Sequence, residues 1–140
     1  MIVADSSYIA EGVLVDEALL RRDGMVAPDL AIYETMEAIW KHQALLGRIS
    51  DGQRYLAALA DLVRSNWLVA LKPDDRLVGE TYDLSVRYRA HPHDTVFVAL
   101  AVMTGLELKT FDRNQSRILE RETARRGRAR SENPAGGGER

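Results

Sequence analysis

The sequence contains no cysteine, few aromatic residues and no long hydrophobic run. Without cysteine, the 140-residue chain has no disulfide framework, no thiolate metal site and no cysteine nucleophile. No run of 18 apolar residues occurs, and the first residues, Met1 to Asp5, lack a basic start. We therefore expect neither a membrane-spanning segment nor a signal peptide, and we predict a cytoplasmic protein that does not associate with membranes.

The composition predicts one globular domain with an acidic body. Hydrophobic residues make up 46% of the chain and charged residues 29%, which is near the globular average. Residues 120–140 carry six arginines and four glutamates, whereas residues 1–119 carry 13 basic and 17 acidic side chains. Nucleic-acid-binding proteins usually present a basic surface, so an acidic body would need bound cations or a local arginine cluster to approach phosphate.

Short apolar runs alternate with helical periodicities, which predicts an α/β fold with a parallel sheet flanked by helices. The predicted strands are residues 2–4, 25–27, 67–71 and 106–111. The predicted helices cover residues 8–14, 16–22, 29 to about 46, 50–65, 74–89, 94–104 and 115–121. Residues 1–121 would form the domain, and residues 122–140, rich in arginine and glycine, would form a disordered tail.

Four carboxylates are predicted to meet at one edge of this sheet. Asp5 follows the first strand and Asp112 follows the last, and ligands bind parallel sheets outside the carboxyl ends of the strands. Asp94 opens the helix before the last strand, and Glu34 lies one turn inside the long helix predicted from residue 29 to about 46. Both are therefore placed to reach the same edge. Carboxylate oxygens are the ligands that Mg²⁺ and Mn²⁺ prefer, so the pattern predicts a divalent cation site.

Electrostatic repulsion supports the same interpretation. Two carboxylates about 4 Å apart repel by roughly 4 kcal/mol at an effective dielectric constant of 20, so four of them need a compensating cation. A bound cation would polarise a phosphoryl oxygen and activate water. Each acid also has a purely structural interpretation: Asp5 and Asp94 as helix caps, Asp112 as a turn residue, and Glu34 as a solvated or ion-paired side chain.

Four segments resemble the successive motifs of PIN-domain ribonucleases. They are residues 1–7 (MIVADSS), 27–34 (APDLAIYE), 94–101 (DTVFVALA) and 108–113 (LKTFDR). The order and spacing are most similar to the small VapC-type toxins of type II toxin–antitoxin pairs, over about residues 1–120. This resemblance implies a PIN-like three-layer fold and an Mg²⁺- or Mn²⁺-dependent endoribonuclease.

The resemblance also assigns residues and partners. The family's catalytic and metal-binding acids correspond to Asp5, Glu34, Asp94 and Asp112. Its small hydroxyl residues near the metal correspond to Ser7 and Thr110, and two further candidates for RNA contact, Arg113 and Asn114, follow the last acid. The implied partners are an RNA substrate, a VapB-type antitoxin that occludes the site, and a second copy of the chain in a homodimer. No nucleotide cofactor is expected.

One departure and three alternatives stay open. Glu37 stands where the family often has asparagine, which adds a fifth carboxylate of open role. The chain could instead be a PIN-like module that binds RNA or its antitoxin without cutting, or a PIN domain that processes RNA and is not a toxin. A phosphoacceptor domain of the flavodoxin-like type is a third alternative, but it would carry a second acid after the first strand, where Ser6 and Ser7 stand.

Overall fold

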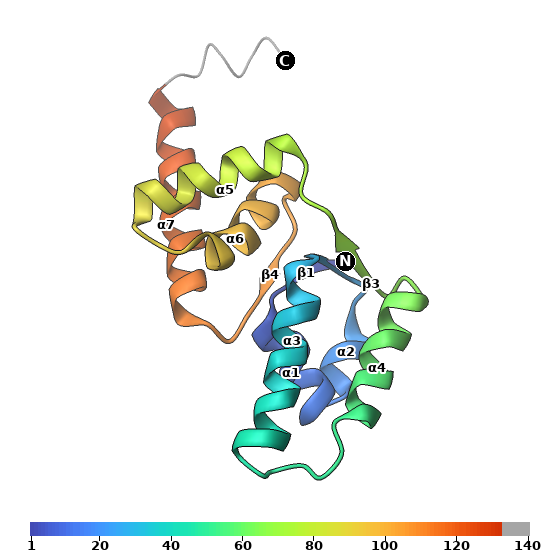
Figure 1. The fold of residues 1–140 in the computed structure, drawn as a ribbon. Helices are drawn as coiled ribbons and strands as arrows, with labels where there is room; N and C mark the ends of the chain where they lie inside the picture. The colour runs from blue at the N-terminus through green and yellow to red at the C-terminus, as the bar shows by residue number, and fades with distance from the viewer. Residues whose placement is uncertain (133–140) are drawn as a thin grey trace.

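A computed structural model describes residues 1–132 and shows four strands and seven α-helices in that range (Figure 1). In chain order the elements are β1 (Ile2–Ala4), α1 (Ser6–Leu14), α2 (Ala18–Arg22), β2 (Met25–Pro28), α3 (Leu30–Trp40), the π-helical turn η1 (Lys41–Leu45), α4 (Gln53–Arg64), β3 (Leu68–Leu71), α5 (Asp75–Tyr88), α6 (Pro92–Thr104), β4 (Leu108–Lys109) and α7 (Arg113–Glu132). The predicted α/β class is confirmed, and the arrangement is consistent with a PIN-like three-layer fold.

The four strands form one parallel sheet in the order β3-β2-β1-β4. In the register of β1, Val3 lies opposite Val26 of β2 on one side and opposite Leu108 of β4 on the other. The chain winds from β1 through β2 to β3 in one direction and then crosses back to place β4 beyond β1. The strand order therefore reverses between β1 and β4, which is the position where open α/β sheets bind ligands.

Helices cover both faces of the sheet. Figure 1 shows α5, α6 and α7 on one side and α1 to α4 on the other. Helix α6 lies between the sheet and its neighbours α5 and α7, and the helix predicted over residues 94–104 is present. Its central residues from Thr95 to Ala101 are all buried, whereas its two ends are partly exposed. Pro92 occupies its first turn, and Gly105, with φ of 72°, ends it in the left-handed conformation. Among residues 1–132, no helix combines the length and apolarity needed to cross a bilayer.

The apolar stripe of α3 faces outward. Its helical spacing is compatible with a core position or a dimer contact for the aromatic residues. Ile39 of the stripe is fully buried, however, whereas Tyr33 and Trp40 are 70% and 52% exposed. A second exposed row lies on α5, where the apolar residues recur at every fourth position: Val78, Tyr82 and Val86. The structure thus excludes a core position for Tyr33 and Trp40.

Two predicted boundaries were wrong for reasons visible in the hydrogen bonds. The predicted strand 106–111 is reduced to β4, because the hydroxyl of Thr110 and the backbone N–H of Phe111 bond to Asp5 and Ser7 instead of continuing the ladder. Helix α4 starts after Gly52 rather than at a Ser50 cap, and the carboxylate of Asp51 accepts from the first helical N–H.

The prediction of disorder from residue 122 was also wrong as far as residue 132, and residues 133–140 lie outside the described part. Helix α7 continues to Glu132 because Glu122, expected in solvent, is fully buried and binds α7 to α5. Its carboxylate accepts hydrogen bonds from Arg125 and Arg126 on its own helix and from Arg87 and Tyr88 on α5, over distances of 2.6 to 3.1 Å.

These partners decide the charge state of Glu122. Burial alone would raise its pKa, but the hydrogen bonds from Arg125, Arg126 and Tyr88 outweigh burial and lower the pKa to about 2. A carboxyl group whose pKa is lower in the folded state stabilises the fold at neutral pH, and this contribution is lost only as the pH falls from about 4.5 through about 2. We call these five residues, Arg87, Tyr88, Glu122, Arg125 and Arg126, the Glu122 clamp.

Replacing the buried carboxylate should therefore destabilise the protein strongly. Removing one partner of a buried, hydrogen-bonded ion pair costs about 3 kcal/mol, so we expect Glu122→Gln to lower the free energy of unfolding by about that amount in urea titrations at pH 7. Glu120→Gln, on the exposed side of the same helix, serves as the matched control and should change stability by less than about 0.5 kcal/mol. Equal stability of the two variants would contradict the role of the clamp.

Candidate functional site

Asp5 lies at the carboxyl end of β1, at the point where the strand order reverses. It is 2% exposed, and its backbone N–H donates to the carbonyl of Lys109 in β4. Its Oδ1 accepts from the hydroxyl of Ser7 (2.7 Å) and the backbone N–H of Tyr8 (3.0 Å), and its Oδ2 accepts from the hydroxyl of Thr110 (2.7 Å). The structural role weighed for Asp5 is thus present, since it caps α1.

Thr110 and Ser7 connect Asp5 to the second strand end. Besides donating to Asp5, the Thr110 hydroxyl accepts from the backbone N–H of Asp112 at 2.8 Å. The Asp112 carboxylate in turn accepts from the backbone N–H groups of Asn114 (2.8 Å) and Gln115 (3.3 Å) at the start of α7. One hydrogen-bonded chain therefore runs from Asp5 at the end of β1 to Asp112 after β4.

Glu34 reaches the same edge from α3. Its Oε1 accepts a 2.5 Å hydrogen bond from the hydroxyl of Ser6, the first residue of α1. Burial raises the pKa of Glu34; the Ser6 hydrogen bond and the electrostatic influence of His93 oppose this rise, and the charges of Asp94 and Asp5 add to it. The alternative of a solvated or ion-paired surface glutamate does not describe this side chain.

Asp94 lies in the first turn of α6 and is about one-quarter exposed. The interpretation of Asp94 as a helix cap was wrong, because His91 occupies the position before the helix. The Asp94 carboxylate is 3.9 Å from Nε2 of His93, and its charge acts on Glu34. Asp94 thus joins the site through α6, on the face of the sheet opposite α3.

The charges of the four predicted acids affect one another's pKa values. Burial, the largest influence, raises the pKa of Asp5; hydrogen bonds from Thr110, Ser7 and Tyr8 lower it, and the charge of Asp112 raises it further. Asp112 therefore acts on Asp5, and both Asp5 and Asp94 act on Glu34. Among residues 1–132, however, no three histidine, aspartate or glutamate side chains are grouped closely enough to form a complete set of metal ligands.

Three other predicted residues stand apart from this group. Arg113 and Asn114 are exposed at the start of α7, and only the backbone of Asn114 contacts an acid of the site. Glu37 is well exposed and lies 3.9 Å from Lys41, with which it forms a surface ion pair one turn beyond Glu34. The side chain proposed as a fifth carboxylate is therefore engaged on the surface of α3.

Sequence reasoning missed the role of Ser6. We assigned the hydroxyl function near the acids to Ser7 and Thr110, and both do bond to Asp5, but the hydroxyl that holds Glu34 belongs to Ser6. The first residue of a helix gives no sequence signal for a partner 28 positions away. His93 was interpreted as a loop residue, whereas it lies in α6 beside Asp94.

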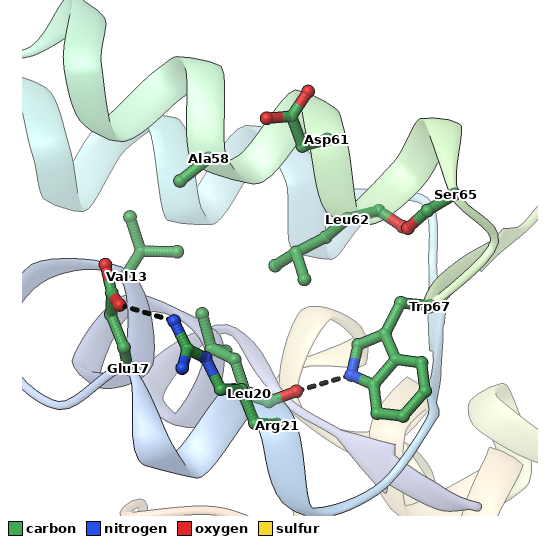
Figure 2. A pocket seen from close by; sticks show the side chains of 9 residues that line it. All are labelled: Val13, Glu17, Leu20, Arg21, Ala58, Asp61, Leu62, Ser65 and Trp67. Atoms are coloured by element: carbon green, nitrogen blue, oxygen red, sulfur yellow. Dashed lines mark hydrogen bonds and ion pairs between the residues drawn. The ribbon is translucent and has the colours of Figure 1, made fainter.

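A larger groove lies away from these acids. Figure 2 shows a groove of about 520 Å³ between α1, α2, α4 and the residue before β3, with apolar walls that include Val13, Leu20 and Leu62. The indole N–H of Trp67 donates to the carbonyl of Leu20 at its base, and an exposed Glu17–Arg21 ion pair lies at its rim. None of the four acids lines this groove, so the acid site and this groove are separate features.

Comparisons with known proteins add no assignment. The chain matches no protein-family model, and a search of curated proteins gave no significant match. The function is therefore inferred from the geometry of the site and from the resemblance of its motifs.

The raised pKa of Glu34 gives a pH-dependent prediction. The folded protein holds this proton more tightly than the unfolded chain, so stability should decrease as the pH rises from the ordinary value of 4.5 through the raised one. In buffers with EDTA we expect Glu34→Gln to be more stable than the wild type at pH 7, with a difference that shrinks towards pH 4. Glu37→Gln is the matched control on the same helix and should follow the wild type; a Glu34→Gln variant that is less stable at pH 7 would contradict the electrostatic interpretation.

Proposed function

We propose that the chain is an Mg²⁺- or Mn²⁺-dependent endoribonuclease that acts in the cytoplasm as the toxin of a toxin–antitoxin pair. The observation that carries this proposal is the position of the acids in the sheet topology. Asp5 and Asp112 follow the two strands between which the strand order reverses, and Glu34 and Asp94 are electrostatically coupled to this pair from opposite faces of the sheet. Ligand sites of open α/β sheets lie at this position.

The donor groups fit a hard divalent cation. All four are carboxylates. Burial is the main cause that raises the pKa values of Asp5 and Glu34, and the negative charges of neighbouring acids add to it; a cation would offset these negative charges. Oδ2 of Asp5 accepts a single hydrogen bond, so it retains an acceptor position. Mg²⁺ typically keeps several waters and takes one or two protein carboxylates, so the site does not require a closed cage of protein ligands.

In this proposal Asp5 and Asp94 would bind the cation directly, and Glu34 and Asp112 would hold it through its bound waters. When bound, the cation would supply the positive charge that activates water and stabilises the charge developing on the phosphate. The hydroxyls of Ser7 and Thr110 fix the carboxylate of Asp5, and Ser6 fixes that of Glu34, so these acids are oriented before RNA arrives. The oxygen of water forms a bond to phosphorus while the bond to the leaving ribose oxygen breaks, and that oxygen takes up a proton.

The sheet topology disfavours the phosphoacceptor alternative. A flavodoxin-like domain has the strand order 2-1-3-4-5 with its ligand between β1 and β3, whereas β1 here lies between β2 and β4. The order seen here also occurs in dinucleotide-binding folds, but those use a glycine-rich first turn, and the turn after β1 is Asp5-Ser6-Ser7. Two alternatives differ from the proposal in what they do. A module that binds RNA without cutting it would show no cleavage activity, and an enzyme that processes RNA outside a toxin pair would not arrest growth.

Cleavage of RNA should depend on the cation and on the acids. We expect the purified protein to cut defined RNAs with Mg²⁺ or Mn²⁺ and to lose this activity in EDTA. Glu34→Gln and Asp5→Asn should each lower the rate by about 100-fold or more, measured by gel electrophoresis of end-labelled RNA. Glu37→Gln should retain the wild-type rate, since its side chain pairs with Lys41 outside the site.

The same variants separate the remaining alternatives. Expression of the wild-type chain alone should arrest growth of the host, and Glu34→Gln should relieve the arrest at equal protein level. Cleavage in EDTA, or full activity of Glu34→Gln, would contradict the proposed mechanism. Cleavage without growth arrest would instead indicate an RNA-processing enzyme.

We further propose that the chain forms a homodimer through the exposed apolar faces of α3 and α5. Tyr33 on α3 and Val78, Tyr82 and Val86 on α5 are 57% to 70% exposed, and a cavity of about 350 Å³ between β2, α5 and α6 is lined in part by Leu77, Val78 and Tyr82. The row on α5 adjoins this cavity through Val78 and Tyr82, and large exposed apolar patches mark protein interfaces.

Charged substitutions on this face should dissociate the dimer. We expect Tyr82→Glu to shift the mass measured by sedimentation from two chains to one, because an unpaired carboxylate would be buried at the interface. Val15→Glu, at an equally exposed apolar position after α1, should leave the dimer intact. A wild-type chain that sediments as a monomer at high micromolar concentration would contradict this proposal.

A further inference from the structure

Helix α7 has a charge opposite to that of the rest of the described chain. It carries seven arginines and three glutamates, a net charge of +4, whereas residues 1–112 carry 11 basic and 17 acidic side chains, a net charge of −6. The basic charge of the protein is therefore concentrated on one helix, which starts directly after the site residue Asp112.

Six of the seven arginines of α7 fall into two groups, and Arg130, which is also exposed, lies outside both. Arg125 and Arg126 are half-buried and paired with Glu122 in the clamp. Four others are exposed and recur at positions i, i+4, i+8 and i+15, which lie within about 80° of one another around a helix: Arg113, Arg117, Arg121 and Arg128. We call these four residues the arginine row.

The arginine row has no acid partner in the described part of the chain. The ion pairs of residues 1–132 use the clamp arginines and leave out all four members of the row. Arg121 stacks over the ring of Tyr88 at 5.0 Å, which directs its guanidinium without neutralising it. Two acids, Glu120 and Glu132, border the row by helical position, so the row retains a net positive charge.

The row is also held in place. Ile118 and Glu122 are buried on the opposite side of α7 and attach it to α5 and α6. Figure 1 shows α7 crossing α5 and extending past it. Arg113 to Arg128 covers about 22 Å at 1.5 Å per residue. A rigid line of cations of this length matches several consecutive phosphates of a nucleic-acid strand.

We propose that the arginine row is a binding track for the RNA backbone, along which a strand extends from the phosphate held at the acid site. This inference rests on the proposed nuclease function and adds to it the path of the substrate. The acidic body repels RNA and the cation site accepts one phosphate, so the row supplies the attraction for the flanking phosphates. It also predicts a preference for extended single strands over short oligonucleotides, which do not reach past Arg113.

The test measures RNA binding separately from cleavage. A fluorescein-labelled, unstructured 20-nucleotide RNA is titrated with full-length protein in EDTA, and affinity is followed by fluorescence anisotropy at several salt concentrations. The row variant changes Arg113, Arg117, Arg121 and Arg128 to Gln. The matched control changes Arg21, Arg22, Arg48 and Arg54 to Gln, which removes the same charge from α2, α4 and the segment between η1 and α4.

We expect the row variant to bind RNA at least 10-fold more weakly than the control at low salt. Its slope of log affinity against log salt should fall by about 0.7 for each phosphate that no longer pairs with an arginine. Thermal unfolding checks that both variants are folded, and a smaller variant, Arg117→Gln with Arg128→Gln, should show about half the change in slope. Glu37→Gln, whose side chain pairs with Lys41 outside the acid site, should bind RNA as tightly as the wild type.

Two outcomes would overturn the binding track. One is equal RNA affinity of the row variant and its control; the other is that the row binds a 20-residue polyglutamate peptide more tightly than RNA, which would indicate an acidic protein partner. The proposed nuclease function fails independently, if the wild type binds RNA through the row but does not cut it with Mg²⁺ or Mn²⁺.

Discussion

The carboxylate of Asp5 joins the two strands between which the sheet reverses its order. One of its oxygens accepts from Ser7 and Tyr8 after β1, and the other accepts from Thr110 after β4. A charge at this depth is unfavourable, and these donors offset only part of the desolvation. Asp5 also connects the elements that carry its neighbours. Helix α1 begins beside Asp5, and α7 begins after Asp112, whose backbone N–H donates to the Thr110 hydroxyl.

Two buried carboxylates in this fold have opposite relations to stability. Glu122 receives hydrogen bonds from three arginines and a tyrosine, and its pKa falls to about 2, so its ionised form stabilises the protein. Asp5 accepts hydrogen bonds from two hydroxyl groups and one backbone N–H. Burial, together with the charge of Asp112, nevertheless raises its pKa. The fold thus neutralises one buried acid with its own cations and leaves the other without one. Such unfavourable charge at a strand end is typical of functional sites, where stability is given up for chemistry.

Much of the fold could be predicted from the sequence, because strand and helix periods are local signals. The uninterrupted apolar residues of β1 and α6 predicted buried elements, and Asp5 was predicted as both a cap and a site residue. The Glu122 clamp could not be predicted: a glutamate followed by arginines three and four positions later is typical of an exposed helix, and Arg87 and Tyr88 lie more than 30 residues away. For the same reason the outward direction of Tyr33, which depends on which face of α3 meets the sheet, could not be deduced from its periodicity.

The hydrogen bond between Thr110 and Asp5 spans 105 positions of the sequence, and this separation has a consequence for synthesis. A nascent chain on the ribosome that stops before residue 108 contains Asp5, Glu34 and Asp94 but neither β4 nor Asp112. We expect this contact to form late in folding, because closing so long a loop costs conformational entropy before the contact can stabilise the chain. Products that end before residue 108 would therefore lack the hydrogen-bonded connection between the ends of β1 and β4.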